Sequence, residues 1–171
     1  SSMRIQGGLK FKTLCGNCNN NLLGLKYDPE LKYFVDGVQT SFQNADRYVV
    51  LPRLIKTEAN LHSVARSVIG HLLAAHSVPE TQKRIINVGA TEVLRQYFLN
   101  SDAPFPADWR LYCWPYFSRT QIILRHAAWM DVSVQNINNK VTYGHLLKFL
   151  PLAFWLVYEQ PHNFIIPENE I

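Results

Sequence analysis

The chain has 171 residues, of which 47% are hydrophobic and 18% are charged; this balance excludes a disordered protein and allows one well-packed core. The formal net charge of +4 permits contact with phosphate groups but is too small to require it. No apolar run reaches the roughly 18 residues of a membrane-spanning helix, and no charged-then-apolar leader is visible. The cysteine count of three is odd, which argues against a secreted disulfide framework. We therefore expect a soluble, cytoplasmic protein without membrane contact.

Apolar spacing divides the chain into a helical middle and a strand-rich end. The segment 57–76 shows the helical pattern most clearly, because its apolar residues recur every three or four positions. Asp28-Pro29-Glu30 supplies the cap, the proline and the first-turn acid of a helix start. Helices are expected, in chain order, over about 19–25, 29–42, 57–76, 79–86 and 90–99.

Strands are expected mainly after residue 108, where aromatic and β-branched residues become frequent and the helical spacing disappears. The segment 142–149 fits either a helical turn or the start of the last strand. Two short strands are also expected earlier, within 3–13 and over 47–54. The later strands are expected over 109–117, 121–134 and 150–158. A helical middle followed by a run of strands predicts an α+β protein with a C-terminal antiparallel sheet of three to four strands.

The residues best suited to chemistry are Cys15 and Cys18, which stand three positions apart in a short polar loop. A Cys-x-x-Cys turn points both thiolates at one ion while backbone N–H groups of the turn bond the sulfurs. Structural zinc takes four ligands, and this pair supplies two. Two other interpretations stay open: a pair of buried or free thiols, and a redox dithiol, for which the sequence lacks a preceding βαβ context. Cys113 is interpreted first as a core residue and second as a distant third ligand.

The histidines do not complete such a site by their spacing. His62, His71 and His76 share one expected helix but stand nine and five positions apart. Side chains that meet on one helical face are three or four positions apart. We expect these three to be surface or hydrogen-bonded core residues, and we expect the same of His126, His145 and His162.

The stretch Leu14-Cys-Gly-Asn-Cys-Asn-Asn, continued through Gly24 to Tyr27-Asp-Pro-Glu-Leu, resembles the second half of the zinc-bound HNH endonuclease-like proteins, which have a treble-clef or ββα-metal fold. The resemblance covers roughly residues 9–31. It implies that the two cysteines of the stretch are structural zinc ligands, at a knuckle that leads into the metal-finger helix. It divides the chain into a zinc-knuckle segment, 1–27, and an α+β domain, 28–171.

The same resemblance implies a role for Asn19, which stands where the family places its last His or Asn, a ligand or orienter of a catalytic divalent ion such as Mg²⁺. Its neighbour Asn20 is an alternative cap for the helix. The family's first Cys pair and its general-base His precede the knuckle, and residues 1–14 contain neither. Three explanations stay open: a missing N-terminal part, suggested by Ser1-Ser2 ahead of Met3; a non-catalytic member; or a site completed by distant residues.

We therefore expect an HNH-like nucleic-acid-binding protein, represented here by the C-terminal part of a metal-dependent phosphodiester hydrolase that lacks its catalytic His. Zinc is its expected structural ion, and Mg²⁺ is needed only for cleavage. Lys10, Lys12 and Lys26 flank the knuckle and are expected to contact DNA phosphates. The alternative is a non-enzymatic binding or dimerisation module, in which two chains of a homodimer share one zinc between their Cys15/Cys18 pairs.

Overall fold

The computed structural model describes residues 14–48, 57–75, 89–130 and 141–158. Helices precede strands along the chain, as predicted, and the α+β class is confirmed. The helical elements are the π-helix η1 (Asn17–Tyr27) and the α-helices α1 (Asp28–Tyr48), α2 (Leu61–Ala74) and α3 (Gly89–Leu99). The strands are β1 (Trp109–Pro115), β2 (Ile122–Met130), β3 (Val141–Phe149) and β4 (Leu152–Tyr158).

The four strands form one antiparallel sheet in the order β1-β4-β3-β2. The first strand therefore pairs with the last, with Trp109 opposite Tyr158. The turn between β3 and β4 contains the cis peptide bond Leu150–Pro151. Where β3 and β4 pair, Gly144 leaves no room for a side chain, because a Cβ there would lie 2.4 Å from the carbonyl oxygen of Leu156.

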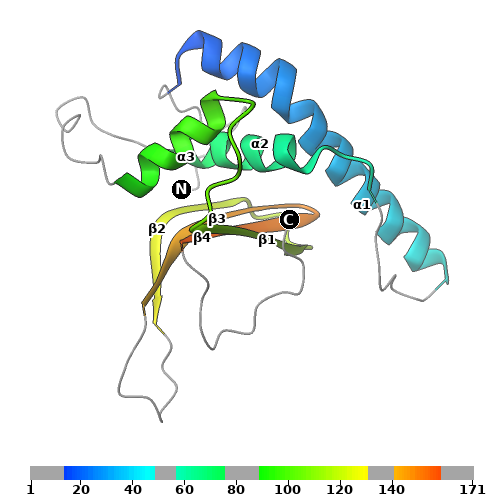
Figure 1. Cartoon of the computed structure of the whole chain (residues 1–171). Helices are drawn as coiled ribbons and strands as arrows, with labels where there is room; N and C mark the ends of the chain where they lie inside the picture. Colours follow the sequence, from blue (N-terminus) through cyan, green and yellow to red (C-terminus); the bar gives the residue numbers. More distant parts are fainter. Residues whose placement is uncertain (1–13, 49–56, 76–88, 131–140, 159–171) are drawn as a thin grey trace, which may run out of the picture.

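The helices form a layer over one face of the sheet, with α2 at the centre of that layer (Figure 1). Helix α2 begins at the cap Asn60, whose side chain accepts a hydrogen bond from the backbone N–H of Ser63 at 3.0 Å. Gly70 lets α2 approach η1 and α3 closely, since a Cβ there would lie 2.5 Å from Cδ2 of Leu23 and 2.7 Å from Cε2 of Phe98. Apolar residues of the four helices and of strands β1, β3 and β4 form one main core. A smaller buried cluster contains Tyr112, Leu146, Trp155 and Val157.

The first helix differs from the prediction of two short helices separated near residue 28. η1 continues into α1 without a break, and Asp28 has helical backbone angles there. Its N–H bonds the carbonyl of Leu23, five residues back, which is the spacing of a π-helix. Asp28 therefore does not cap a new helix, because the π-helical turns of η1 lead directly into α1.

The strand expected over 47–54 is wrong at its first two residues, because α1 continues to Tyr48. The rest of that segment lies outside the described residues. So do the strand expected within 3–13 and the helix expected over 79–86. The ambiguous segment 142–149 is strand β3. The division at residue 27 stays a prediction, although Leu23 and Tyr27 pack into the same core as α2 and the sheet.

Candidate functional site

The two cysteines of the knuckle lie side by side at the start of η1, with Cys15 just before the helix and Cys18 in its first turn. The Sγ atoms of Cys15 and Cys18 are 3.1 Å apart. The backbone N–H of Cys18 donates to Sγ of Cys15 at 3.3 Å, and the N–H of Asn19 donates to the carbonyl of Cys15 at 3.0 Å. Cys15 is exposed, whereas Cys18 is half-buried and packs against the main core. The turn thus bonds one sulfur from the backbone and presents it to solvent.

The two thiols differ in acidity because they share a proton. The hydrogen bond between the two sulfurs lowers the pKa of Cys15, and the N–H groups of the turn lower it further. The same hydrogen bond, together with burial, raises the pKa of Cys18. The first proton therefore leaves Cys15. The thiolate is the form that binds metals and attacks electrophiles, so Cys15 is the leading sulfur in either chemistry.

The distance between the sulfurs of Cys15 and Cys18 can be compared with the distances that zinc ligation and a disulfide bond require. A tetrahedral zinc with Zn–S bonds of about 2.3 Å places two sulfurs about 3.8 Å apart. A disulfide places them about 2.05 Å apart. The observed 3.1 Å needs an outward movement of about 0.7 Å for zinc and an inward movement of about 1 Å for a disulfide. The donor set therefore fits half of a zinc site with the smaller adjustment.

The asparagines after Cys18 bond one another. Nδ2 of Asn19 donates to Oδ1 of Asn20 at 3.1 Å, and both side chains are exposed. The prediction that Asn20 caps the helix is wrong, because Gly16 occupies the cap position of η1 and no side chain caps it. Asn19 keeps an exposed carboxamide oxygen beside the cysteines, which leaves its expected role as an ion ligand a prediction.

Cys113 lies on β1 inside the main core, as its first interpretation predicts. Burial raises the pKa of its thiol to about 11, which disfavours the thiolate that zinc requires. Among the described residues, no three His, Cys, Asp or Glu side chains gather around a common point. A third zinc ligand therefore does not come from Cys113 or from any other described residue.

His62 and His145 have other partners. Nδ1 of His62 lies 3.0 Å from the hydroxyl of Tyr97. His145 is buried and stacks on Trp109, with ring centroids 5.6 Å apart. His76 and His162 lie outside the described residues. The expectation of surface or hydrogen-bonded core histidines holds for His62, and His145 is a core histidine whose ring stacks on an aromatic neighbour.

His71 belongs to a cluster that the sequence did not predict. Oδ1 of Asp28 accepts a hydrogen bond from the hydroxyl of Ser67 at 2.6 Å and lies 3.2 Å from Nε2 of His71. Burial alone would raise the pKa of Asp28, but the bonds to His71 and Ser67 outweigh it and lower that pKa. Packing of α1 against α2 creates this cluster, so no local pattern reveals it.

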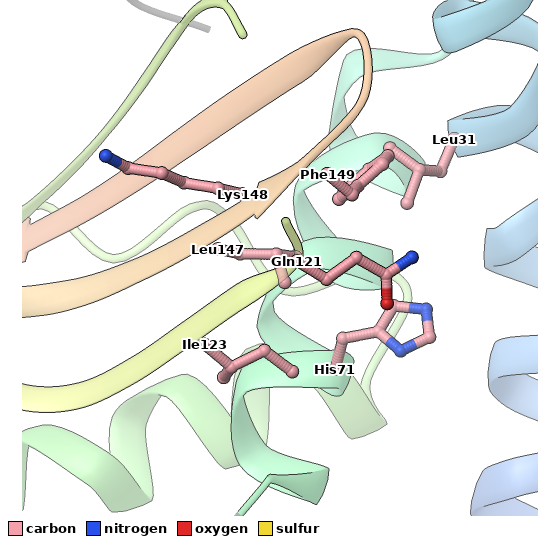
Figure 2. A pocket seen from close by; sticks show the side chains of 7 residues that line it. All are labelled: Leu31, His71, Gln121, Ile123, Leu147, Lys148 and Phe149. Atoms are coloured by element: carbon pink, nitrogen blue, oxygen red, sulfur yellow. The ribbon is translucent and has the colours of Figure 1, made fainter. Parts of the chain in front are cut away.

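His71 also lines a pocket of about 280 Å³ between the helices and the sheet (Figure 2). Leu31 of α1 and Phe149 of β3 close one end of it, and the side-chain amide of Gln121 lies beside the imidazole ring (Figure 2). Most of the lining is apolar. The pocket therefore presents one imidazole, oriented by a carboxylate, at the edge of an apolar surface.

Of the three lysines predicted to contact phosphates, Lys26 lies in the described part of the chain, and Lys10 and Lys12 do not. Lys26 is exposed in the last turn of η1, with its Nζ 5.6 Å from the ring centre of Tyr27.

No family model, curated protein or solved structure matches this chain. No helix within the described residues has the length and apolarity needed to cross a bilayer.

Proposed function

We propose that Cys15 and Cys18 are two of the four ligands of a structural zinc ion in an HNH-like nucleic-acid-binding protein. The observation that carries the proposal is the hydrogen bond from the N–H of Cys18 to Sγ of Cys15, at the solvent-facing start of a long helix. It stabilises a thiolate where a metal can reach it. Zinc, when bound, would tie the loop before η1 to the helix.

The remaining two ligands come from outside the described residues. In the HNH-like arrangement they belong to a preceding part of the natural protein, which would also carry the general base for phosphodiester hydrolysis. Asn19 would then orient a divalent ion such as Mg²⁺, which stabilises charge on the phosphate. The described residues contribute the zinc ligands and one exposed cation, Lys26, so nucleic-acid binding is the activity we assign to this part of the chain.

A homodimer with a shared zinc is the second candidate. The observation in its favour is the exposure of Cys15, which leaves its sulfur open to a second copy of the chain. Two Cys15/Cys18 pairs would then supply four thiolates, which is a complete structural site. This module would bind partners or dimerise without catalysing a reaction.

Cobalt substitution separates the two candidates. Co²⁺ reports sulfur ligation by a thiolate-to-metal absorption band whose intensity grows with the number of bound thiolates. We expect the band in the wild type and in Cys113→Ala, and we expect its loss in Cys15→Ser and Cys18→Ser. A band from a monomer supports the HNH-like site, and a four-thiolate intensity from a dimer supports the shared ion. Absence of the band from the wild type removes both.

Nucleic-acid binding is tested by fluorescence anisotropy with labelled DNA at two salt concentrations. Phosphate contacts release counterions, so affinity should fall as salt rises and should be weaker in Lys26→Gln. Lys32→Gln is a matched control, because Lys32 is exposed on the same continuous helix and pairs with Asp36. Equal affinities of the two variants and the wild type would contradict the assignment of Lys26.

A further inference from the structure

A second pocket, of about 430 Å³, opens between the end of η1, the start of α2 and residues 101–104. Its lining includes two cations, Lys26 and Arg66, and one carboxylate, Asp102. His62 and Ser63, from the first turn of α2, also line it. The pocket is thus polar and carries more positive than negative charge.

Arg66 gives the pocket a buried cation that no anion among the described residues pairs with. Its side chain is 3% exposed. Nε donates to the carbonyl of Tyr97 at 3.1 Å, Nη1 to that of His62 at 3.3 Å, and Nη2 to those of Asn100 and Ala103 at 3.3 and 2.7 Å. No carboxylate of the described residues forms an ion pair with it. Neutral carbonyls orient the guanidinium but do not cancel its charge, which remains costly to bury.

The guanidinium also keeps donor capacity. An arginine side chain carries five N–H groups, and the four bonds of Arg66 use one on Nε, one on Nη1 and two on Nη2. One N–H on Nη1 is left for a further acceptor. An anion in the pocket would supply both that acceptor and the missing negative charge.

Tyr27 supplies a second donor that has no use within the described residues. Its side chain is 1% exposed and lines the pocket, and its buried hydroxyl has no hydrogen-bond partner there. A buried hydroxyl without a partner destabilises the fold, so such groups are rare and call for an explanation. A ligand oxygen bound in this pocket would remove that cost.

The start of α2 adds to the positive potential of the pocket. The helix is 14 residues long, and the aligned peptide dipoles place a partial positive charge at its first turn. His62 and Ser63 belong to that turn. Lys26 brings a full charge from η1 on an exposed, movable side chain. The acid Asp102 opposes these groups but is exposed, so solvent screens it more than it screens Arg66.

We propose that this pocket binds a phosphate group, held by Arg66, Lys26 and the hydroxyl of Tyr27. A phosphate offers several acceptor oxygens and a negative charge, which are the two things the pocket lacks. The proposal does not depend on zinc at the knuckle. Only the source of the phosphate rests on the proposed function, since a nucleic-acid backbone and a free nucleotide present the same group.

The first test is calorimetric titration of the full chain with inorganic phosphate at constant ionic strength, with chloride as the reference. Tyr27→Phe removes one hydroxyl and keeps the ring, and we expect it to weaken binding about tenfold or more. Lys26→Gln should weaken it by a smaller factor, because its charge is exposed. Lys32→Gln should match the wild type. Equal affinity in all four proteins, or no heat from phosphate at millimolar concentration, overturns the proposal.

Stability supplies a readout that does not depend on the ligand. Without phosphate, Tyr27→Phe should be at least as stable as the wild type, since the hydroxyl it removes has no described partner. A marked loss of stability would mean that this hydroxyl already has a partner, which would contradict the proposal. Added phosphate should raise the melting temperature of the wild type more than that of Tyr27→Phe.

The source of the phosphate is settled by two further ligands, a 5′-mononucleotide and a short oligonucleotide without terminal phosphates. Weakening of oligonucleotide binding by Tyr27→Phe identifies backbone phosphates as the ligand. Weakening confined to the mononucleotide identifies a free nucleotide. Cys15→Ser should bind phosphate as the wild type does, so failure of the zinc site and failure of this pocket can be told apart.

Discussion

Arg66→Met tests how the helical layer is held together. Arg66 lies on α2, and its Nε–H bonds the carbonyl of Tyr97 in the last turn of α3. The last carbonyls of a helix have no partner within the helix, so Arg66 serves as a cap that reaches α3 from its neighbour. Its guanidinium carbon also lies 4.1 Å from the ring centre of Tyr97. Methionine fills similar volume but makes neither contact.

The expected cost of Arg66→Met follows from these contacts. Leaving the Tyr97 carbonyl without a partner costs about 1–3 kcal/mol, and loss of the cation–π contact costs about 1–2 kcal/mol. The carbonyls of Asn100 and Ala103 lie nearer solvent, where water can replace the lost bonds. Removal of a buried, unpaired charge offsets part of the loss. We expect a net decrease of about 2 kcal/mol in the free energy of unfolding.

Urea denaturation followed by circular dichroism measures this difference. Arg95→Met is the matched control, because Arg95 lies on α3 with its side chain half-exposed and pairs with Glu92. Loss of such a surface pair costs about 0.5 kcal/mol or less. If Arg66→Met is as stable as Arg95→Met, the guanidinium does not hold α2 to α3, and the argument for its bonds to the carbonyls is wrong.

Three further outcomes follow from close contacts and acidities. Gly144→Ala should lower the unfolding free energy by about 2 kcal/mol or more in urea titrations, because its Cβ would meet the backbone oxygen of Leu156 at 2.4 Å; a neutral result would contradict that pairing. The pKa of Asp28 is lowered in the folded protein from its ordinary value of 3.8, so its ionised carboxylate stabilises the fold at pH values above 3.8. The wild type should therefore be more stable than Asp28→Asn by about 1 kcal/mol after screening. This advantage should shrink as the pH falls below 3.8. Iodoacetamide at pH 8 should label Cys15 before Cys113, as peptide mass spectrometry can show, because the pKa is lowered at the first thiol and raised to about 11 at the second; the reverse order would contradict the burial of Cys113.

The sequence predicts those parts of the fold that repeat a local pattern. The apolar stripe of α2 and the aromatic, β-branched strands identify their elements, because burial of one face leaves a regular spacing. Apolar spacing does not predict that α1 continues to Tyr48, beyond the expected end of its helix. Nor does it identify 142–149 as a strand, because that segment is held in the sheet by pairing with β2 and β4 on its two sides. Partners distant in the chain decide such segments.

The candidate sites divide in the same way. Cys15 and Cys18 are visible in the sequence because their three-residue spacing alone determines that the sulfurs meet. The phosphate pocket has no comparable signal, since Tyr27 and Arg66 stand 39 positions apart and come together through the packing of η1 on α2. A buried arginine with no acidic partner in the described part of the chain is a property of the fold, and no window of sequence displays it.

The zinc content of the purified protein, measured by mass spectrometry of the metal against protein concentration, tests the central proposal most directly. We expect about one zinc per chain for an HNH-like site or about one-half for a shared ion. Both values should fall to near zero in Cys15→Ser and stay unchanged in Cys113→Ala. Zinc absent from the wild type, or bound equally by Cys15→Ser, would show that the knuckle is not a zinc site.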